Sequence, residues 1–295
     1  MSEGMVQQKG QVAVIADTTT AIPEALVQEL GIDLVPYYVN IGKQTLRDVI
    51  EIGREQFYKW LPTATQLPTT SNPGAGDYLE AFRRAYAYTR EMIAITMTSI
   101  GSGAYQAATI AKEMAAQELP DAKILVVDTR QVAMAHGWAT IEAARAARAG
   151  AGLIRVGTVA RETAFDSMMI QTADTLKYLY MGGRIGRAQH MLGALLRIKP
   201  LISMEDGVIV PVGQARSRAG AYDKMVEIIE RKLGAGARIK VAYMHAAAPA
   251  EVEQIRERVE RKFICVESLV TELSPALGVH TGPGTAGLVF LPVRS

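Results

Sequence analysis

The chain has a single cysteine, Cys265, among its 295 residues. One thiol excludes a disulfide framework and a zinc site built from cysteines. Cys265 stands within the apolar run 263–266, so it is either a reactive thiol or a small side chain in the core. Long apolar runs are also missing. No segment reaches the 18 uninterrupted apolar residues of a membrane-spanning helix.

The chain also has no large excess of charge of either sign. The net charge is +2, and no run of lysine or arginine appears, so nothing in the composition favours a nucleic-acid surface. Residues 1–10 contain no apolar stretch of the kind that a signal peptide needs. We therefore expect a cytoplasmic protein. Neither His-x-x-x-His nor a paired-carboxylate spacing occurs, and we expect no metal site and no cofactor.

Apolar residues make up 49% of the chain, which is enough for a large packed core. In the first half, expected strands alternate with expected helices. The strands are residues 11–16, 33–41, 92–98 and 122–127; the helices lie between Pro23 and Gly31 and at 52–61, 76–91, 103–118 and 132–149. Residues 42–48 read as an irregular excursion. This alternation predicts an α/β fold with a parallel sheet covered by helices on both faces.

The pattern changes in the second half. Residues 201–204 and 208–212 flank Glu205-Asp206-Gly207, which is a hairpin signal. The other expected strands are 167–172, 239–244, 266–271 and 288–293, and the helices are 175–180, 217–233 and 249–261. We therefore predict an N-terminal α/β domain, residues 1–160, and a C-terminal α+β domain with a mixed sheet, residues 161–295.

The most informative segment is 92–106, in which an apolar strand runs into hydroxyl groups and glycines before a helix begins. Ser102 and Gly103 would lie at the N-terminus of that helix, where free N–H groups and the helix dipole favour an anionic oxygen. A second hydroxyl cluster, which contains Thr70 and Ser71, occurs at 68–73. The two clusters together predict a site for one carboxylate or phosphate. Asp17, Ser99 and Asp128 also follow expected strands, where ligands of parallel sheets bind.

Three further segments offer donors to an anion. The glycine-rich loop 278–284 contains His280 and Gly282, Arg184 follows Gly183 in a turn, and Arg216 follows the hairpin. Other chemistries fit less well. Gly101-Ser102-Gly103 lacks the third glycine of a dinucleotide fingerprint, and no phosphate-binding Gly-Lys-Ser/Thr is present. Ser102 is not in a Gly-x-Ser-x-Gly elbow, although an esterase or acyltransferase using Ser102 and His280 stays an alternative.

Nine motifs in order resemble the DegV family of bacterial fatty-acid-binding proteins over about residues 11–293. They are ADTT (16–19), PTTS (68–71), TSIGSGAYQ (98–106), VDT (127–129), LKYLYMGGRI (176–185), LRIKPL (196–201), DG (206–207), RSR (216–218) and HTGPG (280–284). The sequence departs from the family pattern at Ala104, where threonine is usual, and at Thr18, where serine is usual.

The resemblance implies two α/β domains that bury a long-chain fatty acid between them. It implies that Thr70, Ser102 and His280 hold the carboxylate, with Arg184 and Arg216 near that end. It further implies presentation of the acid to a dihydroxyacetone-kinase-like fatty acid kinase for phospholipid synthesis, and no catalytic residue in the binding chain itself. A lipid-sensing regulator is the other non-enzymatic reading. We expect a monomer whose only membrane contact is transient.

Overall fold

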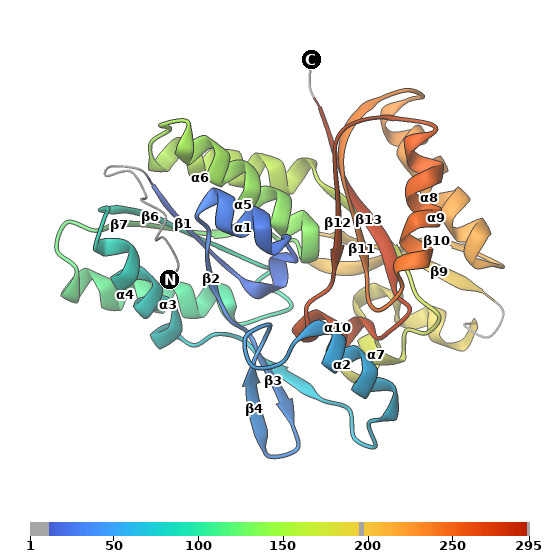
Figure 1. Cartoon of the computed structure of the whole chain (residues 1–295), viewed down its shortest axis with the longest axis horizontal. Helices are drawn as coiled ribbons and strands as arrows, with labels where there is room; N and C mark the ends of the chain where they lie inside the picture. The colour runs from blue at the N-terminus through green and yellow to red at the C-terminus, as the bar shows by residue number, and fades with distance from the viewer. Residues whose placement is uncertain (1–11, 195–197, 294–295) are drawn as a thin grey trace.

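The computed structural model describes residues 12–194 and 198–293. Two sheets lie side by side, the first built from the N-terminal half of the chain and the second from the C-terminal half (Figure 1). A small third sheet lies beneath their junction. The motif at 196–201 falls partly outside the described residues, and residues 1–10 fall wholly outside them.

The first sheet is parallel throughout, as the alternation of strands and helices predicts. Its order is β2 (Asp33–Val35), β1 (Ala13–Asp17), β6 (Glu91–Thr96) and β7 (Lys123–Asp128). Helices α3 (Ala75–Tyr86) and α4 (Ala104–Glu118) cover one face, and α1 (Glu24–Leu30), α5 (Ala133–Arg148) and α6 (Leu153–Asp166) cover the other. The carboxyl ends of β1, β6 and β7 therefore meet at one edge.

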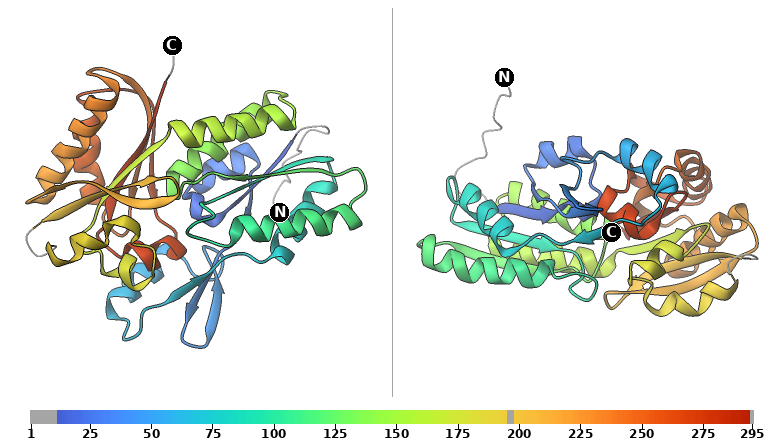
Figure 2. Two further views of the ribbon diagram at one scale, coloured as in Figure 1. Left: turned by 180° about the vertical axis from the view of Figure 1, so that it is seen from behind. Right: turned by 90° about the horizontal axis from the view of Figure 1, so that it is seen from below.

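The second sheet is mixed, which confirms the predicted fold class. Its order is β10 (Val208–Ala215), β9 (Lys199–Glu205), β8 (Met168–Thr172), β13 (Ala286–Pro292), β11 (Arg238–His245) and β12 (Ile264–Glu272). Only β11 and β12 run parallel among these pairs. Helices α8 (Arg218–Leu233) and α9 (Pro249–Glu260) cover the outer face, and α5 and α6 contact the inner face (Figure 2).

The expected strand 33–41 is in fact two strands in different sheets. Pro36 has no N–H to continue a ladder, and the chain leaves β2 there to form β3 (Tyr38–Ile41). The prediction that residues 42–48 form an irregular excursion is also wrong. This segment contains β4 (Gln44–Arg47), joined to β3 by a two-residue turn in which Gly42 has φ +59°. With β5 (Thr69–Ser71) these strands form the third sheet, which the sequence analysis missed.

Helix α6 was also missed, and the predicted boundary at residues 160 and 161 falls inside it. One cluster of buried apolar side chains extends from the first sheet to the inner face of the second, reaching Met169, Met244 and Val289. The division into domains at that boundary therefore stays a prediction. Cys265 packs on the edge of a second cluster beneath α8 and α9, and burial raises the pKa of its thiol. Both observations favour a structural role for this cysteine.

The buried Asp48 ties three segments together. Its side chain accepts hydrogen bonds from the Thr18 hydroxyl at 2.7 Å and from the Ala276 N–H at 3.0 Å, in helix α10 (Pro275–Thr281). Thr18 in turn accepts from the N–H of Tyr37 at 3.1 Å. A buried carboxyl that satisfies donors on separate segments holds them in register, because each donor left without it would bear a desolvation cost.

We expect Asp48 to make stability depend on pH in an unusual direction. Burial raises its pKa to about 6, against hydrogen bonds that lower it. Between about pH 4 and 6 the folded chain keeps a proton on Asp48 that the unfolded chain has released, so the contribution of Asp48 to stability falls by about 3 kcal/mol as pH rises. Urea unfolding of the wild type and Asp48→Asn across this range should give curves that diverge with pH. Parallel curves would contradict the assignment.

Candidate functional site

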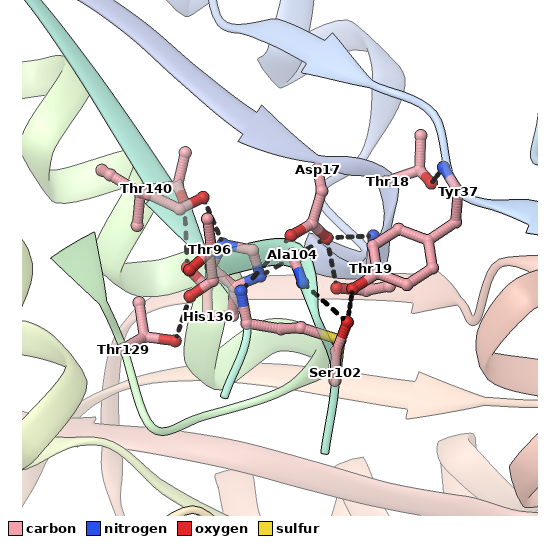
Figure 3. Close-up of polar contacts among 12 residues, drawn as sticks. Asp17, Thr18, Thr19, Tyr37, Thr96, Ser102, Ala104, Thr129, His136 and Thr140 are labelled. Carbon is pink, nitrogen blue, oxygen red and sulfur yellow. Dashed lines mark hydrogen bonds and ion pairs between the residues drawn. The ribbon is translucent and has the colours of Figure 1, made fainter. Parts of the chain in front are cut away.

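Ser102 lies where β6 gives way to α4, as predicted, two residues before the helix begins at Ala104. Its hydroxyl oxygen accepts a hydrogen bond from the Ala104 N–H at 3.2 Å and lies 2.5 Å from the Tyr37 hydroxyl (Figure 3). The Ser102 side chain is thus fixed on one side by the helix terminus and on the other by the chain segment between β2 and β3.

Tyr37 is the site residue that sequence reasoning missed. Its side chain is buried, and burial, with a contribution from Asp17, raises the pKa of its phenol well above 10. The phenol therefore keeps its proton and can donate it to Ser102. Ser102 then retains its own hydroxyl proton for a third group. No motif marks Tyr37, since a tyrosine after a proline is commonplace; only the break in the strand at Pro36 hints at its position.

Thr70 and His280 meet across 210 residues of chain. The Thr70 hydroxyl oxygen lies 2.8 Å from Nε2 of His280. The predicted loop around His280 is in fact helix α10, whose N-terminus is capped by the Ser274 hydroxyl and begins at Pro275. Ser274 followed by Pro275 is a helix-start signal, because serine caps a helix and proline is favoured in its first turn. The helix directs His280, in its last turn, towards strand β5.

The His280 imidazole is neutral at ordinary pH. Burial lowers its pKa to about 4, and the nearby positive charge of Arg184 adds to the effect. Its Nδ1 atom is buried without a hydrogen-bond partner among the described residues. A Cβ at Gly182 would come within 2.3 Å of this Nδ1, so the glycine gives the ring room to lie flat against the turn.

Arg184 and Gly103 complete the polar surroundings. The Arg184 guanidinium donates to the Gly182 carbonyl at 2.6 Å and to the Gly101 carbonyl at 3.4 Å, which bridges the turn after α7 (Lys177–Met181) to the Ser102 segment. A Cβ at Gly103 would meet the Asn72 amide oxygen at 2.9 Å, so only glycine allows this close approach. Gly183, whose φ is +69°, lines the larger cavity described below.

Three predicted residues lie elsewhere. Ser71 is exposed and accepts from the Asn40 amide at 3.0 Å, because side chains alternate along β5 and Thr70 takes the inward position. Gly282 ends α10 and packs against the Tyr178 ring, so it lines neither cavity. Arg216 is exposed before α8 and lines neither cavity; its neighbour Arg218 binds Asp174 and the Gly284 carbonyl.

A buried polar layer supports this edge of the first sheet (Figure 3). The Asp17 carboxyl accepts from the hydroxyl and the N–H of Thr19, and from the Met97 N–H at 3.3 Å. His136 donates to the Ile95 carbonyl at 3.0 Å, and its Nδ1 lies 4.0 Å from Asp17. Burial lowers the pKa of His136, so a neutral imidazole underlies the site.

Two adjacent cavities open at these residues. The smaller one, about 80 Å³, is lined by the polar groups described above. The larger one, about 320 Å³, is mostly apolar and runs between the two sheets. The residues that line both are Met97, Gly101, Arg184, Leu277 and His280. A small polar pocket, referred to below as the polar head pocket, therefore lies next to an apolar chamber, which is in the size range of small-molecule sites.

The described ranges contain no group of three or more His, Cys, Asp or Glu side chains that could hold a metal ion. Within the same ranges, no helix has both the length and the apolar character needed to cross a bilayer.

The family model for "Uncharacterised protein, DegV family" matches residues 11–293. This chain belongs to the DegV family. A DegV domain-containing protein of Streptomyces coelicolor is 33% identical over 280 residues, which cover 94% of this chain and 97% of the relative. Another, from Clostridium perfringens, is 30% identical over 95% of this chain and 98% of the relative.

Solved DegV structures share the fold closely. The structure of a fatty-acid-binding DegV family protein from Thermus thermophilus superposes with a TM-score of 0.89 at 28% identity, over 96% of this chain and all of the other. DegV of Bacillus subtilis, described as a fatty acid binding protein, gives a TM-score of 0.85 at 26% identity with the same coverage. Relatives with this fold thus bind fatty acids.

We expect His280 to titrate far below an ordinary histidine. Since its pKa is lowered to about 4, the folded chain resists a proton that the unfolded chain accepts near pH 6.5, and the contribution of His280 to stability is lost as pH falls from about 6.5 to 4. NMR of the imidazole nitrogens in ligand-free protein should show the His280 transition near pH 4. A midpoint at or above 6.5 would show that the ring is solvated or paired with an acid.

Proposed function

We propose that this chain binds one long-chain fatty acid, with the carboxylate in the polar pocket and the acyl chain in the apolar cavity. The observation that carries the proposal is that the two cavities are adjacent and share Arg184 and His280 in their walls. An amphiphile with an anionic head and an apolar tail matches both parts. The fatty-acid binding of relatives with the same fold supports it.

The polar pocket supplies hydrogen-bond donors without using a charged imidazole. We infer that the Tyr37 hydroxyl donates to Ser102 and that the Nε2–H tautomer of His280 donates to Thr70. Each hydroxyl then has its own proton free for a carboxylate oxygen. Arg184 provides the nearby positive charge. A buried carboxylate stays ionised only with such donors, because desolvation alone would raise its pKa.

The acyl chain supplies the affinity. Each buried methylene contributes up to about 0.8 kcal/mol, so a long chain contributes roughly 10 kcal/mol before the costs of ordering. The cavity offers the needed lining. Its apolar side chains come from the second sheet, from the segments that follow β6 and precede α5, and from α7; they include Met97, Val132, Met169, Leu179, Met204 and Ile209.

The esterase alternative is less well supported. A serine nucleophile needs a base within hydrogen-bond reach, and the partner of Ser102 is a phenol with a raised pKa. His280 is bonded to Thr70 instead. A serine-reactive fluorophosphonate probe separates the two readings, since stoichiometric labelling of Ser102 would favour the enzyme.

We further propose that the chain presents the carboxylate to a dihydroxyacetone-kinase-like fatty acid kinase, which forms the acyl phosphate. The exposure of Arg184 at the polar end supports this, because a second protein can reach that end. In this proposal the chain is a monomer that contacts the membrane only in passing. A lipid-sensing regulator without a kinase is the alternative, and capture of such a kinase by the loaded protein distinguishes them.

The first experiment is mass spectrometry of an organic extract from the purified, denatured protein. We expect close to one long-chain fatty acid per chain. An empty extract, from protein that also fails to take up added fatty acid, would refute the proposal.

Ser102→Ala should weaken fatty-acid binding about tenfold, because it removes one donor to a charged acceptor. The melting temperature should change little, since Ser102 is only partly buried. The matched control is Ser71→Ala, which alters a hydroxyl on the neighbouring outward face and should leave the affinity unchanged. Equal affinities of the two variants in a fluorescent fatty-acid displacement assay would contradict the site.

Arg216→Ala should lower acyl-phosphate production with the kinase while fatty-acid affinity stays the same, because Arg216 is exposed and lines neither cavity. Arg231→Ala, another exposed arginine at the far end of α8, serves as the control. Normal acyl-phosphate production with Arg216→Ala would show that Arg216 does not take part in binding the kinase.

A further inference from the structure

One polar side chain stands out on the apolar part of the cavity. Side chains alternate along β8, so Met169 and Gln171 face the cavity while Ile170 faces the core under α8. Gln171 is only 5% exposed. On the adjacent strand its partner is Gly287, where a Cβ would come within 2.6 Å of the Gln171 Cα and Cβ. The glycine leaves the Gln171 side chain uncovered on its cavity side.

Gln171 differs from the other polar side chains of this cavity. Thr98 donates to the Gly207 carbonyl, and Thr281 donates to the Leu277 carbonyl. Arg184 donates to two carbonyl groups, and His280 is paired through Nε2, although its Nδ1 has no partner among the described residues. Among the described residues, by contrast, none forms a hydrogen bond with the Gln171 amide. Gln171 also does not line the polar head pocket, so it lies along the path of the tail.

An amide left unpaired in this chamber becomes costly once a ligand fills it, because the ligand displaces water from the amide without supplying other partners. A saturated acyl chain would cover this amide and leave it unpaired. A leucine or methionine would serve such a ligand better. The glutamine is therefore informative about the ligand, since its amide can both donate and accept.

We propose that Gln171 is a specificity-determining residue, which selects a fatty acid bearing a hydroxyl group along its chain. The proposal rests on the fatty-acid binding proposed above and deepens it. The hydroxyl of the ligand would donate to the amide oxygen and accept from the amide N–H. The tail of the ligand would then satisfy the one polar side chain that the described residues leave unpaired on this wall.

A neutral hydroxyl fits this position better than the alternatives. A second carboxylate would lie in an apolar chamber away from Arg184 and would lack a cation. A double bond offers only its π face to the amide N–H, which is a weak interaction, and nothing to the amide oxygen. A single hydroxyl group can donate a hydrogen bond to the amide oxygen and accept one from the amide N–H.

The test compares stearic acid with a series of hydroxystearic acids in which the hydroxyl moves along the chain. Wild-type protein should bind at least one mid-chain isomer about tenfold more tightly than stearic acid. Gln171→Leu should reverse this preference, because the hydroxyl must then be buried unpaired. The matched control is Met169→Leu, which changes the same wall without changing its polarity and should keep the preference.

The outcomes separate this inference from the proposed function. If wild type and Gln171→Leu bind stearic acid well and share the same ranking of all isomers, Gln171 does not select a hydroxyl, although fatty-acid binding stands. If the wild type binds neither stearic nor hydroxystearic acid, the proposed function itself fails. Should Gln171→Leu fold poorly, Gln171→Met repeats the comparison; loss of the preference there supports the proposal, and its persistence overturns it.

Discussion

The hydrogen bond between Thr70 and His280 is the contact on which the site depends. It joins strand β5, near the start of the chain, to helix α10, near its end. That contact closes the polar pocket at the junction of all three sheets, and Asp48 stabilises it by holding the N-terminal end of α10. The geometry of the polar pocket is thus set by elements that are far apart in the sequence.

The electrostatics of the site rest on neutral donors. Buried Tyr37 and His280 stay uncharged, the phenol because its pKa is raised and the imidazole because its pKa is lowered. A pocket of neutral donors with one exposed guanidinium holds an anion without neutralising it fully inside the protein. Such an arrangement suits a chain that binds a carboxylate and leaves it accessible, as the proposed function requires.

The apolar chamber is formed where two layers of the structure meet. Its walls come from the inner face of the second sheet and from the N-terminus of α5, so the cavity exists only where these two layers meet. Most of its lining contributes affinity without direction. In the proposed selectivity, the Gln171 amide supplies the direction, because a hydroxyl group on the tail would pair with it.

Much of this protein was determined by its sequence. Apolar periodicity and the glycine and proline positions predict the parallel first sheet and the mixed second sheet, since these signals are local. The hydroxyl and glycine pattern likewise places Ser102 at a helix start. The pairing of Tyr37 with Ser102, the helix under His280, the outward turn of Ser71 and the isolation of Gln171 arise only in the tertiary structure. Each of these features depends on which distant segment packs alongside. In strand β5 and in the seven-residue helix α10, the direction in which a side chain points is set by that packing and cannot be derived from the local sequence pattern.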